Sequence, residues 1–305
     1  MRWQKLGRVF EADGQRPWMI SHTQNPVAEL VQSDVFRVYF TCRDAKNRSH
    51  VGWLEIDLSR PNEVLNLAEN PLLAPGPSGM FDDAGAMTAS VVRHESRRYF
   101  YYTGWSNRAD SRAPYHLAVG LASGFDDDGP PSVSRLPGPV MERNPIDPLF
   151  CCCPEVRVEG SRWRMWYLSG LDWVRVEDRT LPSYHLRYAE SDDGVQWERR
   201  GTVALELGPD EVGFTRPSIV RENGGYVMWY AVRGHDARYR PGRAVSADGL
   251  TWTREDDRTG LDLSSEGWDS EMIAYPHVFN HHGIQYMLYC GNDYGRSGLG
   301  LAVRA

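Results

Sequence analysis

The chain has 305 residues, of which 41% are hydrophobic and 25% charged, and this composition is typical of a soluble globular protein long enough to bury a large core. Its net charge of -7 provides no basic face, which excludes nucleic acid as a partner. The N-terminus has no signal-peptide core, and no segment approaches the ~18 apolar residues of a membrane helix, so we expect a cytoplasmic protein without membrane contact. Five cysteines, an odd number, predict reduced thiols.

Five strand-like segments recur at intervals of 59 to 65 residues, and four of them carry a proline at the same position. In chain order they are TQNPVAEL from residue 23, TASVVR from 88, CCPEVRV from 152, TRPSIVR from 215 and AYPHVFN from 274. An aromatic-rich second run follows each of them, and a third run comes after a variable loop. The repeat predicts five similar units built from strands.

Two units show a fourth run after a tight turn, in SDDGVQWERRG and SADGLTWTRED. Asp-Gly between short strands favours a β-hairpin because glycine adopts positive φ at no steric cost. The fifth unit reaches the end of the sequence after its third run, and RWQKLGRVF near the N-terminus resembles the fourth run QWERRGTVA. We therefore expect an all-β, single-domain, five-bladed β-propeller over residues 1–305. It has four-stranded blades and no long helices, and the N-terminal strand completes the last blade.

The stretch CCCPEV at residues 151–156 places three cysteines in the first strand of the third unit. Alternation along a strand sends Cys151 and Cys153 to one side and Cys152 to the other, so the three thiols do not share one metal. The same alternation groups Glu155 with Cys151 and Cys153, on the face that we expect to look into the central channel. Glu155 is therefore the informative residue, and we predict no metal site because no pair has zinc-type spacing.

The unit pattern, the S-x-D-G-x-x-W turns, the CPE strand and the closing GWDSEMIAYPHVF and GNDYGRSGLGLAV resemble the five-bladed propeller glycosidase superfamily, which includes glycoside hydrolase families 43, 32 and 130. The resemblance covers essentially the whole sequence. It implies a glycosidase acting on an oligosaccharide or a small sugar conjugate, with carboxylates from different blades at the channel mouth. It implies no required cofactor and allows a structural cation near His277.

The candidate catalytic residues follow from this resemblance. Glu155 is similar to the acid of family 32, although in that family the glutamate precedes the cysteine, and partial burial would raise its pKa towards that of a working acid. Glu271 in WDSEMIAYP and Asp83 in MFDDAGAM are the candidates for the second carboxylate. A salt bridge, an inter-blade hydrogen bond or a solvated loop position is the structural alternative for each.

Asn25 departs from the family pattern, because families 32 and 43 place an aspartate in the first blade and an amide cannot act as nucleophile or base. Either another carboxylate has taken over, or the propeller is non-hydrolytic: sugar-binding, phosphorolytic like family 130, or a tailoring enzyme in polysaccharide or metabolite biosynthesis. Arg43, Arg216 and Arg233 favour an anionic sugar or phosphate as ligand, since guanidinium groups bind carboxylate and phosphate bidentately. Salt bridges are the alternative.

The remaining candidates lie near the ends of the first and second runs, where side chains from several blades would meet. Tryptophans there offer flat faces to a sugar, while packing or structural hydrogen bonding is the alternative for each residue. The predicted substrate-binding residues are His22, Asn25, Arg43, Asp82, Trp105, Trp173, Arg216, Arg233, His235 and His277.

Overall fold

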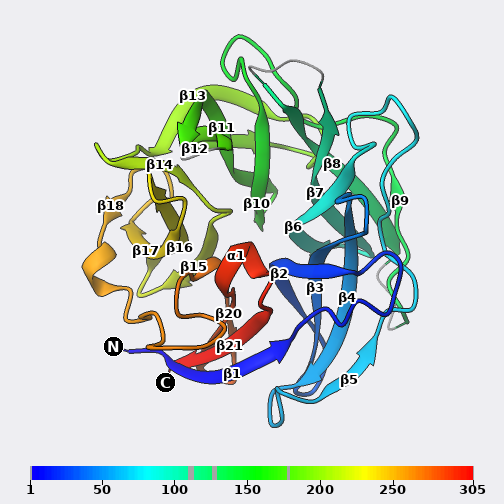
Figure 1. Cartoon of the computed structure of the whole chain (residues 1–305). Coiled ribbons are helices and arrows are strands. Elements are labelled where there is room, and N and C mark those ends of the chain that lie inside the picture. The colour runs from blue at the N-terminus through cyan, green and yellow to red at the C-terminus, as the bar shows by residue number, and fades with distance from the viewer. Residues whose placement is uncertain (1, 109–112, 126–128, 177–178, 305) are drawn as a thin grey trace.

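The structure is a computed structural model that describes residues 2–108, 113–125, 129–176 and 179–304. It is all-β, as the sequence predicts, apart from the short helix α1 (Asn292–Gly295) and the 3-10 turn η1 (Asp256–Arg258). Neither helical segment in the described part of the chain is long and apolar enough to cross a bilayer. Figure 1 shows the strands arranged around a common centre, with the two chain ends side by side.

The strands differ widely in length, and the longest belong to the second and third runs of the third unit. In chain order they are β1 (Gln4–Phe10), β2 (Ser21–Gln32), β3 (Val35–Arg43), β4 (Ser49–Asp57), β5 (Val64–Leu67), β6 (Gly85–His94), β7 (Arg97–Asn107), β8 (Tyr115–Phe125), β9 (Ser134–Arg135), β10 (Cys151–Glu159), β11 (Arg162–Val176), β12 (Arg179–Ser191), β13 (Glu198–Leu205), β14 (Glu211–Phe214), β15 (Ser218–Glu222), β16 (Gly225–Gly234), β17 (Tyr239–Ser246), β18 (Thr253–Arg254), β19 (Ala274–His281), β20 (Ile284–Cys290) and β21 (Leu299–Arg304).

Consecutive strands pair antiparallel within each repeat unit. The orders are β2-β3-β4-β5, β6-β7-β8-β9 and β10-β11-β12-β13 in the first three units. In the fourth unit β15-β16-β17-β18 follow one another, and β14 also pairs with β16. The last sheet has the order β19-β20-β21-β1, so the N-terminal strand lies beside the C-terminal strand.

The two S-x-D-G-x-x-W segments form tight turns at the start of the fourth strands. Asp193 Oδ1 accepts hydrogen bonds from the amides two and three residues later, and Ser191 Oγ accepts one from the amide of Gly194. Asp248 and Ser246 make the same bonds in the fourth unit. Side chains that satisfy backbone amides hold a turn in shape. These residues therefore stabilise the fold.

Three of the sheets are each stabilised by a buried aspartate that makes the same two contacts. This aspartate precedes the first strand and accepts a hydrogen bond of 3.0 Å from a tyrosine of the second strand, 20 residues later in the sequence. It also forms an ion pair of 2.6 to 3.0 Å with a cation of the fourth strand. The three sets are Asp82 with Tyr102 and Arg135, Asp147 with Tyr167 and Arg199, and Asp269 with Tyr289 and Lys5. Lys5 of β1 thus takes the part of a fourth-strand cation in the last sheet.

The core is distributed between neighbouring sheets. Aromatic side chains of the second strands meet across these boundaries, as Tyr39 of β3 meets Phe100 of β7, with ring centroids 5.3 Å apart. Trp229 of β16 packs edge-on against Trp3 at the N-terminus, with centroids 5.4 Å apart. Edge-to-face pairs add to the free energy of area burial. This packing leaves the first strands around the centre, where their side chains face one another.

Candidate functional site

The first strands of three units bulge at the residue before the repeated proline. Asn25, Cys153 and Tyr275 each have a φ of 52°, and the pairing register shifts at each of these points. The amide of Cys153 is held by Thr103 Oγ1 of the preceding sheet, 2.7 Å away. Left-handed backbone is uncommon for residues other than glycine and persists where the surroundings hold it. The three bulged residues thus occupy the same position in their units, directly before the repeated proline, and we call this position the bulge level.

Arg216 occupies the same level in the fourth unit and fills the centre. Its fully buried guanidinium donates hydrogen bonds to the carbonyl oxygens of Ala89 at 3.0 Å, Pro26 at 2.9 Å and Pro276 at 3.4 Å. These acceptors belong to three other units, and Nη1 lies 3.7 Å from Glu155 Oε2 in a further one. The predicted substrate-binding residue Arg216 therefore directs its terminal nitrogens to the protein and ties the first strands together.

Glu155 lies beside this arginine with only 5% of its surface exposed. Arg157 Nε is 3.6 Å from Glu155 Oε1 and Arg216 is on the other oxygen. Burial raises the pKa of Glu155 above its usual range, while Arg157 and Arg216 oppose that change. A carboxyl group in such surroundings retains its proton at higher pH, which is the property of a general acid.

Replacing Glu155 with glutamine is expected to change how stability depends on pH. Because the pKa of Glu155 is raised on folding, the folded state holds this proton more tightly than the unfolded chain, so its contribution is present below the unfolded pKa and is lost as pH rises through the folded pKa. From about pH 4 upward, the unfolding free energy of the wild type should fall relative to that of the variant. Urea unfolding over a pH series measures this, and a pH-independent difference would contradict it.

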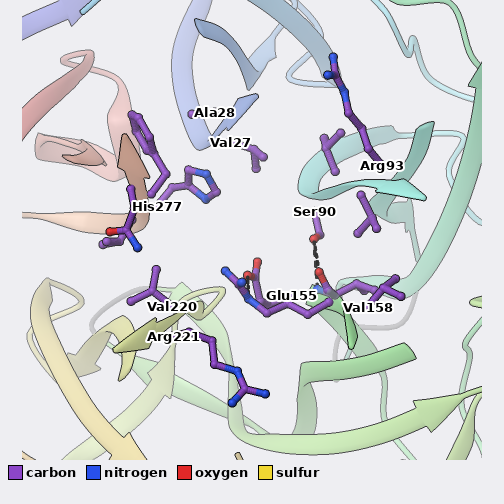
Figure 2. Close-up of a pocket in the computed structure, with 16 residues that line it drawn as sticks. Val27, Ala28, Ser90, Arg93, Glu155, Val158, Val220, Arg221 and His277 are labelled. Carbon is purple, nitrogen blue, oxygen red and sulfur yellow. Dashed lines mark hydrogen bonds and ion pairs between the residues drawn. The ribbon is translucent and has the colours of Figure 1, made fainter. Parts of the chain in front are cut away.

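A pocket of about 450 Å³ is lined by the later halves of the first strands of all five units. Figure 2 shows Glu155 and His277 pointing into this space from different sides. Glu155 is the one carboxylate among the described lining residues, whereas Arg93, Arg157 and Arg221 bring positive charge. Hydrolysis by two carboxyl groups needs them about 5 to 10 Å apart across the bond. The lining of this pocket supplies one of the two.

His277 is a neutral imidazole at the edge of the same pocket. Burial, then the charges of Arg216 and Arg157, lower its pKa well below the usual value, and its ring bonds to the backbone of Ala28. Its Nδ1 atom has no hydrogen-bond partner in the described part of the chain. The nitrogen can accept a hydrogen bond from a ligand, but the two arginine charges disfavour the structural cation that the resemblance allows here.

At the opposite ends of the first strands, basic and aromatic residues from all five units gather. We call this group the arginine–aromatic cluster. Its members come from the starts of first strands, the ends of second strands and the first halves of third strands, except Tyr294, which lies in α1. They are His22, Arg43, Trp105, Tyr115, Trp173, Tyr184, Arg233, Tyr239, Tyr275 and Tyr294. Five of the ten predicted substrate-binding residues are thus brought together: His22, Arg43, Trp105, Trp173 and Arg233.

Aromatic contacts connect the cluster from unit to unit. The ring of Tyr115 lies 6.4 Å from that of Trp105 and 4.8 Å from that of Trp173, in edge-to-face geometry. The hydroxyls of Tyr184 and Tyr239 are 2.7 Å apart. Burial raises the pKa of Tyr115, Tyr184 and Tyr239. These phenols are therefore neutral hydrogen-bonding groups at physiological pH.

Arg43 and Arg233 carry the positive charge of the cluster. Arg233 is 3% exposed and donates to the carbonyl oxygen of Pro182 at 2.8 Å, and Arg43 donates to Asn47 Oδ1 at 2.8 Å. The Nε atoms of both arginines are buried, and neither has a hydrogen-bond partner within the described part of the chain. Neither forms an ion pair within 4.0 Å among the described residues, although Asp293 lies near Arg43. The buried charge of Arg233 is costly without a counter-ion, and a bound anion would compensate it.

The backbone around the cluster is strained. Besides the three bulges, His22 has a φ of 64°, and Asp293 and Tyr294 in α1 have φ values of 49° and 57°. Strain of this kind gathers at ligand-binding sites when the rest of the fold can hold it. Three of these residues, His22, Asp293 and Tyr294, flank the two arginines.

The other predicted residues belong neither to the arginine–aromatic cluster nor to the lining of the Glu155 pocket. Asp83 Oδ2 accepts a hydrogen bond from the amide of Gly79 within a turn, and Glu271 is largely exposed, 3.8 Å from Arg238. Asp82 is occupied by its hydrogen bond from Tyr102 and its ion pair with Arg135. His235 is exposed in the loop after β16. Asn25 is buried at its bulge, and its Oδ1 has no hydrogen-bond partner among the residues that the structure describes. Neither candidate for the second carboxylate lines the Glu155 pocket.

Sequence reasoning missed the tyrosines of the cluster. The sequence pattern that indicates these residues is a tyrosine near the start of the third run in four units. They are Tyr115, Tyr184, Tyr239 and Tyr294, and the first two occur in the sequence YHL. Third strands pair with second strands, so these positions lie opposite the ends that carry Trp105, Trp173 and Arg233. A comparison of third runs across units would have placed them.

Comparison with solved structures defines the class of fold. A glycosyl hydrolase from Bacteroides ovatus superposes with a TM-score of 0.73 and 15% identity, over 99% of this protein and 92% of that one. A second match comes from family 130, a family of mannoside phosphorylases that contains glycoside hydrolases targeting β-1,2 mannosidic linkages in Candida mannan. Its TM-score is 0.72 and its identity 16%, over 99% of this protein and 93% of that one. A thermostable family-43 glycoside hydrolase gives 0.65 and 16% over 94% and 90%. The protein has the fold of the propeller glycosidase superfamily, which confirms the resemblance.

Sequence comparison then identifies the family. No protein-family model matches the sequence. It is 41% identical over 304 residues to Rv1502 of Mycobacterium tuberculosis strain ATCC 25618 / H37Rv and to MT1551 of strain CDC 1551 / Oshkosh, with 99% of each protein covered. This protein belongs to the same family as these two mycobacterial proteins.

Proposed function

We propose that this protein acts on an anionic carbohydrate, a sugar that carries phosphate or carboxylate, held at the arginine–aromatic cluster. The observation that carries the proposal is the pair formed by the buried Arg233 and the partly buried Arg43, whose Nε–H groups lack partners and which have no ion pair among the described residues. Guanidinium groups bind these anions through paired, charge-assisted hydrogen bonds. The half-buried rings of Trp105 and Trp173 supply apolar faces for the sugar.

The proposed function depends on a complete, closed propeller. We infer five blades, built from β2–β5, β6–β9, β10–β13, β14–β18 and β19–β21 with β1, and a ring closed by the pairing of β1 with β21. In a closed ring, the ends of first strands from every blade meet at one mouth of the channel. This arrangement explains how residues as far apart as His22 and Tyr294 share one cluster.

We infer further that this protein does not hydrolyse its substrate with a pair of carboxylates. Asn25 is an amide, the residues at the same level in the other units are Thr88, Cys153, Arg216 and Tyr275, and none of these is acidic. A bound phosphate can serve as the attacking group in phosphorolysis, which then needs one carboxyl acid at the cluster. Asp293, near Arg43, is the candidate for this acid, because Glu155 lies in the separate pocket. The geometry therefore favours phosphorolysis, binding or tailoring of the sugar.

Hydrolysis with Glu155 as acid is the second candidate. It is favoured by the raised pKa of Glu155 and by the pocket beside it. Glu271 or Asp83 would have to serve as the second carboxylate, and each lies in a different environment from Glu155. This candidate predicts that neutral glycosides are cleaved without phosphate and that Glu155→Gln abolishes the cleavage.

Matched pairs of sugars test the main proposal. Calorimetry would compare glucose 1-phosphate and mannose 6-phosphate with their neutral parents, and glucuronate with glucose. We expect at least one charged sugar to bind at least ten times more tightly than its neutral parent. Equal binding of charged and neutral members, or no binding by any charged sugar, would contradict the proposal. Incubation of oligosaccharides with and without phosphate then separates phosphorolysis from hydrolysis.

A further inference from the structure

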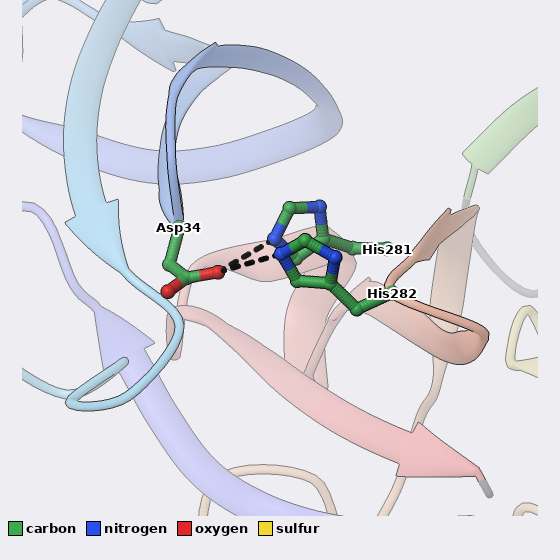
Figure 3. A group of neighbouring side chains, drawn as sticks. All are labelled: Asp34, His281 and His282. Atoms are coloured by element: carbon green, nitrogen blue, oxygen red, sulfur yellow. Dashed lines mark hydrogen bonds and ion pairs between the residues drawn. The ribbon is translucent and has the colours of Figure 1, made fainter.

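Two hairpin turns from opposite ends of the chain bring an aspartate and two histidines together, as Figure 3 shows. Asp34 lies between β2 and β3, His281 is the last residue of β19, and His282 follows it in the turn to β20. Their ligand atoms all fall within 4.8 Å of one another. His281 Nε2 is 2.7 Å from Asp34 Oδ1, and His282 Nε2 is 3.4 Å from the same oxygen. Three metal-ligating groups therefore converge without any contribution from the arginine–aromatic cluster.

The donor set and its spacing suit a transition metal. Imidazole nitrogen with one carboxylate oxygen is a ligand set that binds zinc, nickel, copper or iron in proteins. Ligand distances of about 2.0–2.1 Å around a tetrahedral zinc ion place donor atoms about 3.3 Å apart. The observed distances of 2.7 and 3.4 Å from Asp34 Oδ1 to the two histidines bracket that spacing, and the two imidazole nitrogens lie within 4.8 Å of each other.

The surroundings of the site fix His281 in place and leave His282 exposed to solvent. The side chain of His281 is 10% exposed, and its ring packs edge-on against Phe36 with centroids 5.1 Å apart. The side chain of His282 is 75% exposed at its turn. A rigid first ligand lowers the entropy cost of binding, and an exposed one allows an ion to enter with water in the remaining position.

We propose that Asp34, His281 and His282 form a binding site for a divalent transition metal of the zinc class. Asp34 belongs to the first sheet and the two histidines to the last, so the metal joins the sheets that meet where the two termini lie. Spacing along the sequence gives no sign of this site, because Asp34 is 247 residues from His281. A metal that binds only the folded state raises its stability.

Titration of the metal-free, tag-free full-length protein with zinc chloride and cobalt chloride tests the proposal. We expect one zinc ion per molecule by calorimetry, a rise in melting temperature with zinc, and a cobalt spectrum without sulfur-to-cobalt charge transfer. The last readout separates this site from the five cysteines. Absence of zinc binding at 100 µM, a concentration of about 10⁻⁴ M, or a thiolate spectrum would overturn the proposal.

Two conservative variants locate the ion. His282→Asn suits the turn, because His282 has a φ of 49° and asparagine tolerates that conformation, and Asp34→Asn keeps the shape of the carboxylate. Each is expected to weaken zinc binding at least tenfold and to remove the rise in melting temperature. His116→Asn is the matched control, since it removes a histidine that lies 2.9 Å from the carboxylate of Glu142 and belongs to no group of three ligands among the described residues. Unchanged affinity in both variants would overturn the assignment.

Discussion

Replacing Arg216 with methionine is expected to lower the free energy of unfolding by about 3–5 kcal/mol, the cost of breaking a buried ionic contact by removing one partner. The substitution leaves three carbonyl oxygens, from Ala89, Pro26 and Pro276, without their donor. It also removes one of the two cations within 4.0 Å of Glu155 among the described residues and leaves Arg157 alone. Because Arg216 connects first strands from several units, the loss falls on the whole fold.

Urea unfolding measures this effect as a shift in midpoint with an unchanged slope. Arg200→Met is the matched control, since Arg200 is exposed and pairs with Glu198 on the same strand. The control should change stability by less than about 1 kcal/mol, as is usual for a surface ion pair. A loss of that small size in Arg216→Met would show that the buried guanidinium does not hold the centre together.

Replacing Arg43 or Arg233 with methionine is expected to weaken binding of a charged sugar by roughly 10- to 100-fold. Hydrogen bonds to charged groups contribute about 1.5–3 kcal/mol each, and 1.4 kcal/mol is a factor of ten in affinity. The effect should be specific to the charged group, so a neutral sugar should bind the variants and the wild type alike. Calorimetry with each ligand found for the wild type measures both values.

Controls separate charge from folding in these variants. Arg43→Lys and Arg233→Lys keep a positive charge but lose the planar fork, so they should restore part of the affinity. Arg48→Met removes a nearby arginine that pairs with Asp44 and should leave affinity unchanged. Equal binding of charged sugars by the folded Met variants and the wild type would show that the anion lies elsewhere.

The sequence predicts much of this fold because its signals are local. The period of the prolines and of the aromatic runs places the strands of each unit, and the resemblance of RWQKLGRVF to QWERRGTVA places β1 beside β21. Turn residues such as Asp193 act within a few residues of themselves, so their role is visible in the sequence. The regular spacing of Asp82, Asp147 and Asp269 from their tyrosines was also present to be found.

Side-chain direction near the centre is what the sequence does not determine. Arg216 and Arg43 are alike as residue types, yet Arg216 donates to three carbonyl oxygens of other units, whereas Arg43 donates to the side chain of Asn47 in its own unit. The bulge at Cys153 interrupts strand alternation immediately before Glu155, so counting along the strand cannot fix which side that carboxylate faces. Only the contacts between units reveal which residue stabilises and which is free for a ligand.

The most direct test of the proposed anion site is a crystal structure of the wild type with a bound sugar phosphate, or with inorganic phosphate. We predict an anion within hydrogen-bonding distance of Arg43 and Arg233, beside Tyr115 and Tyr275, which lie near these arginines. Its sugar should rest among the tryptophans of the cluster. An anion bound instead in the Glu155 pocket, against Arg93 or Arg157, would contradict the proposed site.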